Sequence, residues 1–67
     1  EPTAALAFNL GLCAEMQRDF DAAVDWYGEA QRQGLRGSAI PEALERVEGN
    51  RRALADWEAR KRLIGRE

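Results

Sequence analysis

Cysteine and histidine are almost missing from this chain of 67 residues, which has one cysteine, Cys13, and no histidine. A single thiol cannot close an internal disulfide, and without histidine the usual zinc spacings are impossible. Chains below roughly 70–80 residues bury too little apolar surface for more than a few kcal/mol of stability without staples or partners. We therefore expect one small domain of marginal stability, or one that a partner stabilises.

Long apolar runs and a strong excess of one charge are also lacking. The longest uninterrupted apolar run is a few residues, whereas a membrane span needs roughly 18. The net charge of −2 is too small to indicate nucleic-acid binding. No charged-then-apolar leader opens the chain, and it begins with Glu1 rather than Met. We expect a soluble fragment or processed product without a membrane span; the sequence does not indicate its compartment.

Signals of catalysis are missing as well. No histidine is present to activate Cys13, which we expect to pack as a small apolar residue in a row with Leu6 and Leu10. The early carboxylates occupy positions typical of helix surfaces and caps, and no glycine-rich phosphate loop follows a strand. The sequence therefore predicts a protein that is not an enzyme and that holds no cofactor or metal.

Helical periodicity is what the chain does contain. Apolar residues recur every three or four positions over about residues 4–17, 20–33 and 41–64, which predicts three helices. Thr3 and Asp19 stand where the first two helices need an N-cap. The first helix carries a second apolar row of Phe8, Leu12 and Met16, which leaves only a narrow polar side. We therefore expect an all-α fold whose first helix has neighbours on more than one face.

The third helix is expected to be the longest element. Gly34 supplies a left-handed stop, residues 34–40 form a loop, and Pro41 suits a first helical turn. At 1.5 Å per residue, this helix would be about 36 Å long against about 21 Å for the second, so its last third would overhang. Its apolar stripe is thin and is interrupted around Asn50 and Arg51. Four acid-before-base pairs are expected along it: Glu42/Arg46, Glu48/Arg52, Asp56/Arg60 and Glu58/Arg62.

Positive charge gathers at the end of the chain. Residues 51–66 hold six basic side chains, Arg66 included, against two acidic ones, a net charge of +4. Acids near the start of the helix and bases near its end complement the helix macrodipole, and this is one explanation. A basic docking surface is the other.

Small and large residues alternate at characteristic positions in the first half of the chain: Ala7, Leu10, Gly11, Ala23, Tyr27 and Ala30. This pattern resembles one tetratricopeptide repeat (TPR). The resemblance implies a TPR-like antiparallel helical hairpin over residues 1–37, then a linker and a long C-terminal capping helix over 38–67. It also implies upstream repeats, because such hairpins work in arrays. Four positions depart from the pattern: Ala7 and Ala14 replace aromatics, Arg18 the turn glycine, and Leu35 the closing proline.

In proteins of this family the first helix of a hairpin lines a concave, ligand-holding surface. The resemblance therefore implies a partner-binding set of Ala5, Phe8, Asn9, Leu12, Glu15 and Met16, with Glu15 as its acidic point. Asn9 stands where the family often has an asparagine that bonds a peptide backbone. Two alternatives stay open: the apolar row packs on a preceding hairpin or a second copy, and Asn9 merely faces solvent.

The two tryptophans pose a similar choice. Trp26 is expected to be buried under the third helix, with exposure as the alternative. Trp57 lies on the overhang beside Arg60, Lys61 and Ile64, and this set is a possible second contact surface, with packing on the hairpin as the alternative.

Together these features predict a non-enzymatic scaffold that binds a protein partner, either a peptide or a helix. The alternative is an element of self-association that joins further copies of the chain. A third possibility is a segment that terminates an enzyme or a lipid-anchored protein.

Overall fold

The computed structural model describes all residues except 1–2 and 66–67. Arg66, which carries part of the expectation for the basic end of the chain, lies outside the described residues. Within the described part, the chain forms three helices and no strand.

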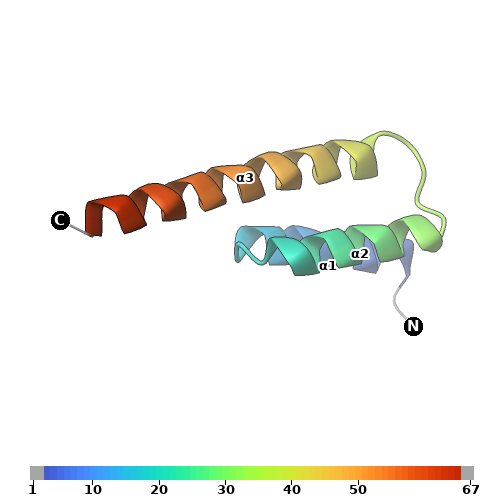
Figure 1. Cartoon of the computed structure of the whole chain (residues 1–67). Helices are drawn as coiled ribbons and strands as arrows, with labels where there is room; N and C mark the ends of the chain where they lie inside the picture. The colour runs from blue at the N-terminus through green and yellow to red at the C-terminus, as the bar shows by residue number, and fades with distance from the viewer. Residues whose placement is uncertain (1–2, 66–67) are drawn as a thin grey trace.

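The helices are α1 (Ala4–Met16), α2 (Phe20–Arg32) and α3 (Ala39–Gly65). Figure 1 shows α1 and α2 as an antiparallel hairpin, with α3 returning along it and continuing beyond the α1–α2 turn. The expected all-α fold, a helical hairpin followed by a long C-terminal helix, is confirmed.

The helix starts follow from local hydrogen bonds. The Thr3 hydroxyl accepts from the Leu6 amide at 3.2 Å, and the Asp19 carboxylate accepts from the Ala22 amide at 3.3 Å. Both expected N-caps are therefore confirmed. α3 begins earlier than expected, because Ile40 belongs to the helix and its side chain is only 1% exposed. Its assignment to the loop was wrong: burial of this aliphatic side chain extends the helix towards the hairpin.

Small residues allow the helices of the hairpin to cross closely. A Cβ added to Gly11 would lie 2.5 Å from Cε1 of Tyr27, whose side chain is fully buried. The core residues are Ala7, Gly11 and Ala14 of α1, Phe20, Ala23, Tyr27 and Ala30 of α2, and Ile40, Ala43 and Val47 of α3. The ring of Tyr27 thus occupies the space that the missing side chain of Gly11 leaves.

Only the first part of α3 contributes to this core. Beyond Val47, Leu54 is half-buried, and then Trp57 and Ile64 are 59% and 72% exposed. Residues spaced by three and four from Ile40 to Ile64 nevertheless form one stripe, polar only at Asn50 and Lys61. The stripe that packs on the hairpin therefore continues, without a partner in the described structure, along the overhang.

Two arginines of α3 form ion pairs with the hairpin, whereas the sequence predicts pairs within α3 alone. Of the four expected pairs, only Glu48–Arg52 lies within 4 Å, at 3.5 Å, among the described residues. Arg51 pairs with Asp21 of α2 at 2.8 Å and with Glu48 at 2.9 Å. Arg46 pairs with Glu15 of α1 instead of Glu42, and the two later expected pairs lie more than 4 Å apart. Exposed pairs along one helix are worth only tenths of a kcal/mol, so they hold these side chains weakly.

The two helices of the hairpin end in the same way but with different residues. Arg18 has φ 62° and Gly34 has φ 100°, and each follows a C-cap residue. The next amide donates back into the helix in both cases, Asp19 to the Ala14 carbonyl at 2.9 Å and Leu35 to the Ala30 carbonyl at 3.0 Å. These are Schellman motifs. Arg18 therefore adopts a left-handed conformation that suits glycine better.

We expect Arg18→Gly to raise the free energy of unfolding by about 1 kcal/mol, because glycine has no Cβ to strain in this conformation. Urea denaturation followed by circular dichroism measures the change. The matched control is Gly34→Arg at the equivalent position, which should lower stability by a similar amount. A loss of stability in Arg18→Gly would show that the arginine side chain makes a compensating contact.

Candidate functional site

One polar cluster connects all three helices. The Tyr27 hydroxyl donates to Glu15 Oε1 at 2.6 Å, and Arg46 donates from Nη2 to Oε1 at 2.9 Å and from Nε to Oε2 at 2.5 Å. The Glu15 side chain is only 12% exposed. Its two oxygens are thus engaged within the chain, so Glu15 contributes a compensated charge to the surface instead of the free acidic point expected from the sequence.

The cluster shifts the pKa values of its members. The Arg46 guanidinium, by its hydrogen bonds, holds the pKa of the Glu15 carboxyl below its ordinary 4.5, although burial opposes this. Burial, followed by the hydrogen bond to Glu15, raises the pKa of Tyr27 to about 12. Near neutral pH the cluster therefore consists of an ionised carboxylate, a protonated phenol and a guanidinium.

We expect Glu15→Gln to lower the free energy of unfolding by roughly 1–2 kcal/mol at pH 7, because charge-assisted hydrogen bonds are lost at a partly exposed site. Since the pKa of Glu15 is lowered by folding, its contribution is complete above the unfolded-state value. It is lost as pH falls below about 4.5 and through the folded-state pKa.

Denaturation of both proteins at pH 7 and pH 3 measures this effect. The gap between wild type and Glu15→Gln should narrow at pH 3. Because the other carboxylates are common to both proteins, a gap of equal size at the two pH values would contradict the role of ionised Glu15.

The other residues of the expected partner-binding set divide by burial. Ala5, Asn9 and Met16 are exposed, Met16 to 85%. Phe8 and Leu12 are half-buried against the core, and the ring of Phe8 lies 5.4 Å from that of Tyr27. The row Phe8–Leu12–Met16 therefore passes from core to surface along α1.

Three adjoining hollows lie where α1 and the α1–α2 turn face α3. The first, of about 420 Å³, is lined by Leu12, Glu15, Met16 and Arg46. A second shares Glu15 and Met16 with it and reaches Asn50, and it also shares Arg18 with the third. We call this continuous region the α1–α3 surface. It brings together part of the first expected set with residues of α3.

The third hollow, which we call the turn cleft, is the part of this surface that lies next to the overhang. It measures about 450 Å³ and is lined by Arg18, Ala53, Leu54 and Trp57. Arg60, Lys61 and Ile64 follow Trp57 by three, four and seven residues and so share its face of α3. The two sets that the sequence suggests as separate contacts therefore adjoin in space.

Sequence reasoning missed the contributions of Arg18 and Arg46 to this surface. Arg46 stands four residues after Glu42, which suggests a pair within the helix, and its contact with Glu15 spans 31 positions. The stripe spacing from Ile40 to Ile64 is the available signal, because it places Leu54 and Trp57 in line with the core of α3. No local signal identifies Arg18 as a neighbour of Trp57.

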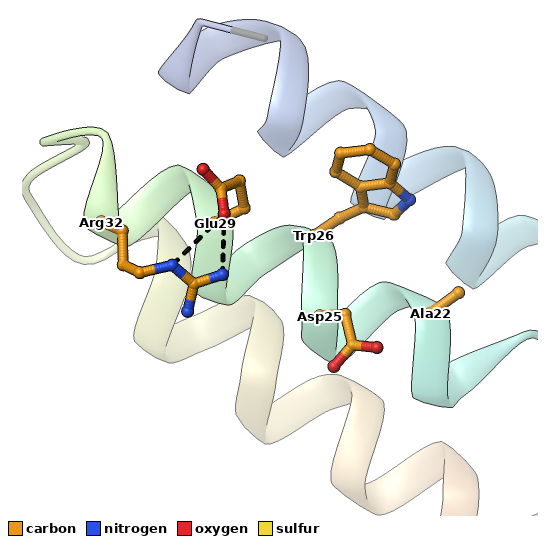
Figure 2. Close-up of a pocket in the computed structure, with 5 residues that line it drawn as sticks. All are labelled: Ala22, Asp25, Trp26, Glu29 and Arg32. Carbon is orange, nitrogen blue, oxygen red and sulfur yellow. Dashed lines mark hydrogen bonds and ion pairs between the residues drawn. The ribbon is translucent and has the colours of Figure 1, made fainter. Parts of the chain in front are cut away.

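Another hollow, of about 560 Å³, lies on the surface of α2. Figure 2 shows its lining residues, Ala22, Asp25, Trp26, Glu29 and Arg32, which all come from this one helix. Arg32 Nη2 pairs with Glu29 at 2.7 Å. Since no second element forms a wall, this hollow is a shallow depression on a helix surface.

Two expectations for individual side chains were wrong. Trp26 is half-buried, but Figure 2 shows its indole pointing to the side of α2 on which α1 lies, away from α3. Cys13 is exposed because α1 packs on α2 through Ala7, Gly11 and Ala14. The row of Leu6, Leu10 and Cys13 lies one residue position round the helix from this contact.

The part of the chain that the structure describes offers no candidate group of metal ligands and no helix suited to span a membrane. No three His, Cys, Asp or Glu residues there are grouped to hold a metal ion. None of the three helices combines the length and apolarity needed to cross a membrane.

Comparisons of the chain with protein-family models, with curated proteins and with solved structures found no match.

Proposed function

We propose that this protein is a non-enzymatic interaction scaffold that binds a helix or peptide of a partner protein on the α1–α3 surface. The observation that carries this proposal is the exposure of Met16 (85%) and Trp57 (59%) at two hollows that share Arg18, on a surface built by α1, the α1–α2 turn and α3. Large apolar side chains that gather at a shaped surface mark interaction sites, whereas scattered ones do not.

The resemblance to TPR hairpins supports the same proposal. Six positions that compose or adjoin the repeat pattern are buried where the helices pack: Ala7, Gly11, Ala14, Ala23, Tyr27 and Ala30. The expected ligand-facing residues Asn9 and Met16 are exposed on α1. These features agree with a hairpin whose first helix presents side chains to a ligand.

The proposal is tested by placing a photo-crosslinking amino acid at position 16 of the full chain, expressed in the cells in which the protein naturally occurs. The matched control position is Glu45, which is exposed on α3 and lines none of the three hollows. We expect discrete adducts with a partner protein from position 16 and none from position 45. Equal labelling from both positions, or none from position 16, would overturn the proposal.

Self-association is a second candidate, favoured by Leu63 and Ile64, which are 66% and 72% exposed on the overhang. Light scattering after size exclusion distinguishes the candidates. A multimer that Leu63→Asp converts to monomer, with helicity kept, would support self-association. A helical monomer at concentrations of roughly 100 μM, far above those of specific binding, would exclude it.

A further inference from the structure

The turn cleft has the features of an anchor site. Trp57 reaches it from α3 and remains 59% exposed, while Ala53 and Leu54 supply apolar walls. Tryptophans in such positions often dominate binding energy, because one side chain buries a large area. A side chain of a partner that enters the cleft would therefore cover the indole.

The apolar stripe beyond the cleft indicates the shape of the partner. Ile64 follows Trp57 by seven residues, which is two helical turns or about 10.5 Å along α3. Between Ile40 and Val47 the same stripe already packs against a helix, α2. A partner helix with apolar residues at the same three- and four-residue spacing can continue this packing along the overhang.

Charge indicates the chemistry of the partner. Arg18 lines the cleft, and Arg60 and Lys61 share the face of Trp57; in the described structure none of the three lies within 4 Å of a carboxylate. The nearest acid on the α1–α3 surface, Glu15, is engaged by Arg46. The neighbours of Trp57 in the chain, Asp56 and Glu58, project from other faces of the helix. This surface is therefore positive.

Arg18 also stands at a backbone position that suits glycine. Its φ of 62° is one that glycine adopts without strain, and the equivalent position in the chain is Gly34. A strained residue at a cleft is a feature of functional sites. Here an arginine lines the cleft at a position where glycine would offer no side chain.

We propose that the turn cleft and the overhang bind an acidic amphipathic α-helix, with Trp57 as anchor and with Arg18, Arg60 and Lys61 facing its carboxylates. This inference rests on the proposed function and specifies its partner. A second copy that offered its own overhang would bring Arg60 and Lys61 against the same cations, so charge complementarity favours a different, acidic helix.

Two synthetic 18-residue helical peptides with the same leucine spacing test this proposal, one with Glu and one with Lys at the intervening positions. Indole N–H signals in NMR report binding, because Trp57 lines the cleft, whereas Trp26 lines a separate hollow on α2 and serves as an internal control. We expect the Glu peptide to shift Trp57 and not Trp26, and to bind at least tenfold more tightly than the Lys peptide. Raising the salt concentration should weaken its binding.

The variant Arg60→Glu/Lys61→Glu should reverse the preference between the peptides, and Trp57→Ala should weaken both while leaving helicity unchanged. Equal binding of the two peptides, or shifts confined to Trp26, would overturn the proposal. If the protein self-associated, seen as a rise in molar mass, and thereby released the Glu peptide, the occupant would be a second copy. This result would also overturn the proposal. Crosslinks from position 16 that persist in any of these cases would leave the proposed function standing.

Discussion

Gly11→Ala should unfold most of the protein at 25 °C. The added Cβ would lie 2.5 Å and 2.7 Å from Cε1 and Cδ1 of Tyr27, distances that real Cβ atoms do not adopt. Tyr27 is fully buried and its hydroxyl is bonded to Glu15, so the ring cannot move aside without losing both packing and a hydrogen bond. Overpacking costs about 1–3 kcal/mol or more, which is comparable to the whole stability of a domain this small.

Circular dichroism at 222 nm with urea denaturation measures this loss. The matched control is Gly49→Ala, also within a helix, where an added Cβ meets nothing within 4 Å. That variant should gain up to about 1 kcal/mol, because alanine has the higher helix propensity. If the two variants behaved alike, the close approach of Gly11 to Tyr27 would be disproved.

Ile40→Ala should cost about 2–4 kcal/mol, whereas Ile64→Ala should change the free energy of unfolding by less than about 0.5 kcal/mol. The two isoleucines belong to the same stripe of α3, but Ile40 is 1% exposed and Ile64 is 72% exposed. The first substitution leaves a cavity where α3 meets the hairpin. The second removes surface that already contacts water.

The same pair also separates folding from binding. Ile64→Ala should weaken the binding of the Glu peptide at unchanged stability, since Ile64 shares the face of Trp57. Thermal and urea unfolding give the first quantity and NMR titration the second. Equal destabilisation by both substitutions would mean that the overhang is packed in solution, contrary to its exposure here.

The architecture could be predicted from local patterns because local physics determines it. Thr3 and Asp19 cap helices with their own side chains, and Gly34 ends one with its own backbone freedom. The small residues of the hairpin identify where its helices cross. None of these features depends on a distant part of the chain.

The errors concern contacts that only the assembled helices decide. Arg46 can pair with Glu42 within one helix or with Glu15 of another, and the partly buried carboxylate that already binds Tyr27 is the stronger acceptor. Cys13 is exposed while its neighbour Ala14 is buried, so a difference of one residue position around α1 decides which of the two packs in the core. For Trp26, both sides of α2 are adjacent to a helix, and the sequence does not distinguish them.

The length of α3 beyond its tertiary contacts makes part of the surface depend on helix propensity. An isolated helical segment of this size is marginal in water, so the last turns of α3 should exchange their amide hydrogens faster than the turns around Val47. A partner that binds there must first select the helical form, and its affinity falls with the fraction that is helical. Exposed residues on the opposite face of α3 from Trp57, such as Ala59, would then tune binding through preorganisation.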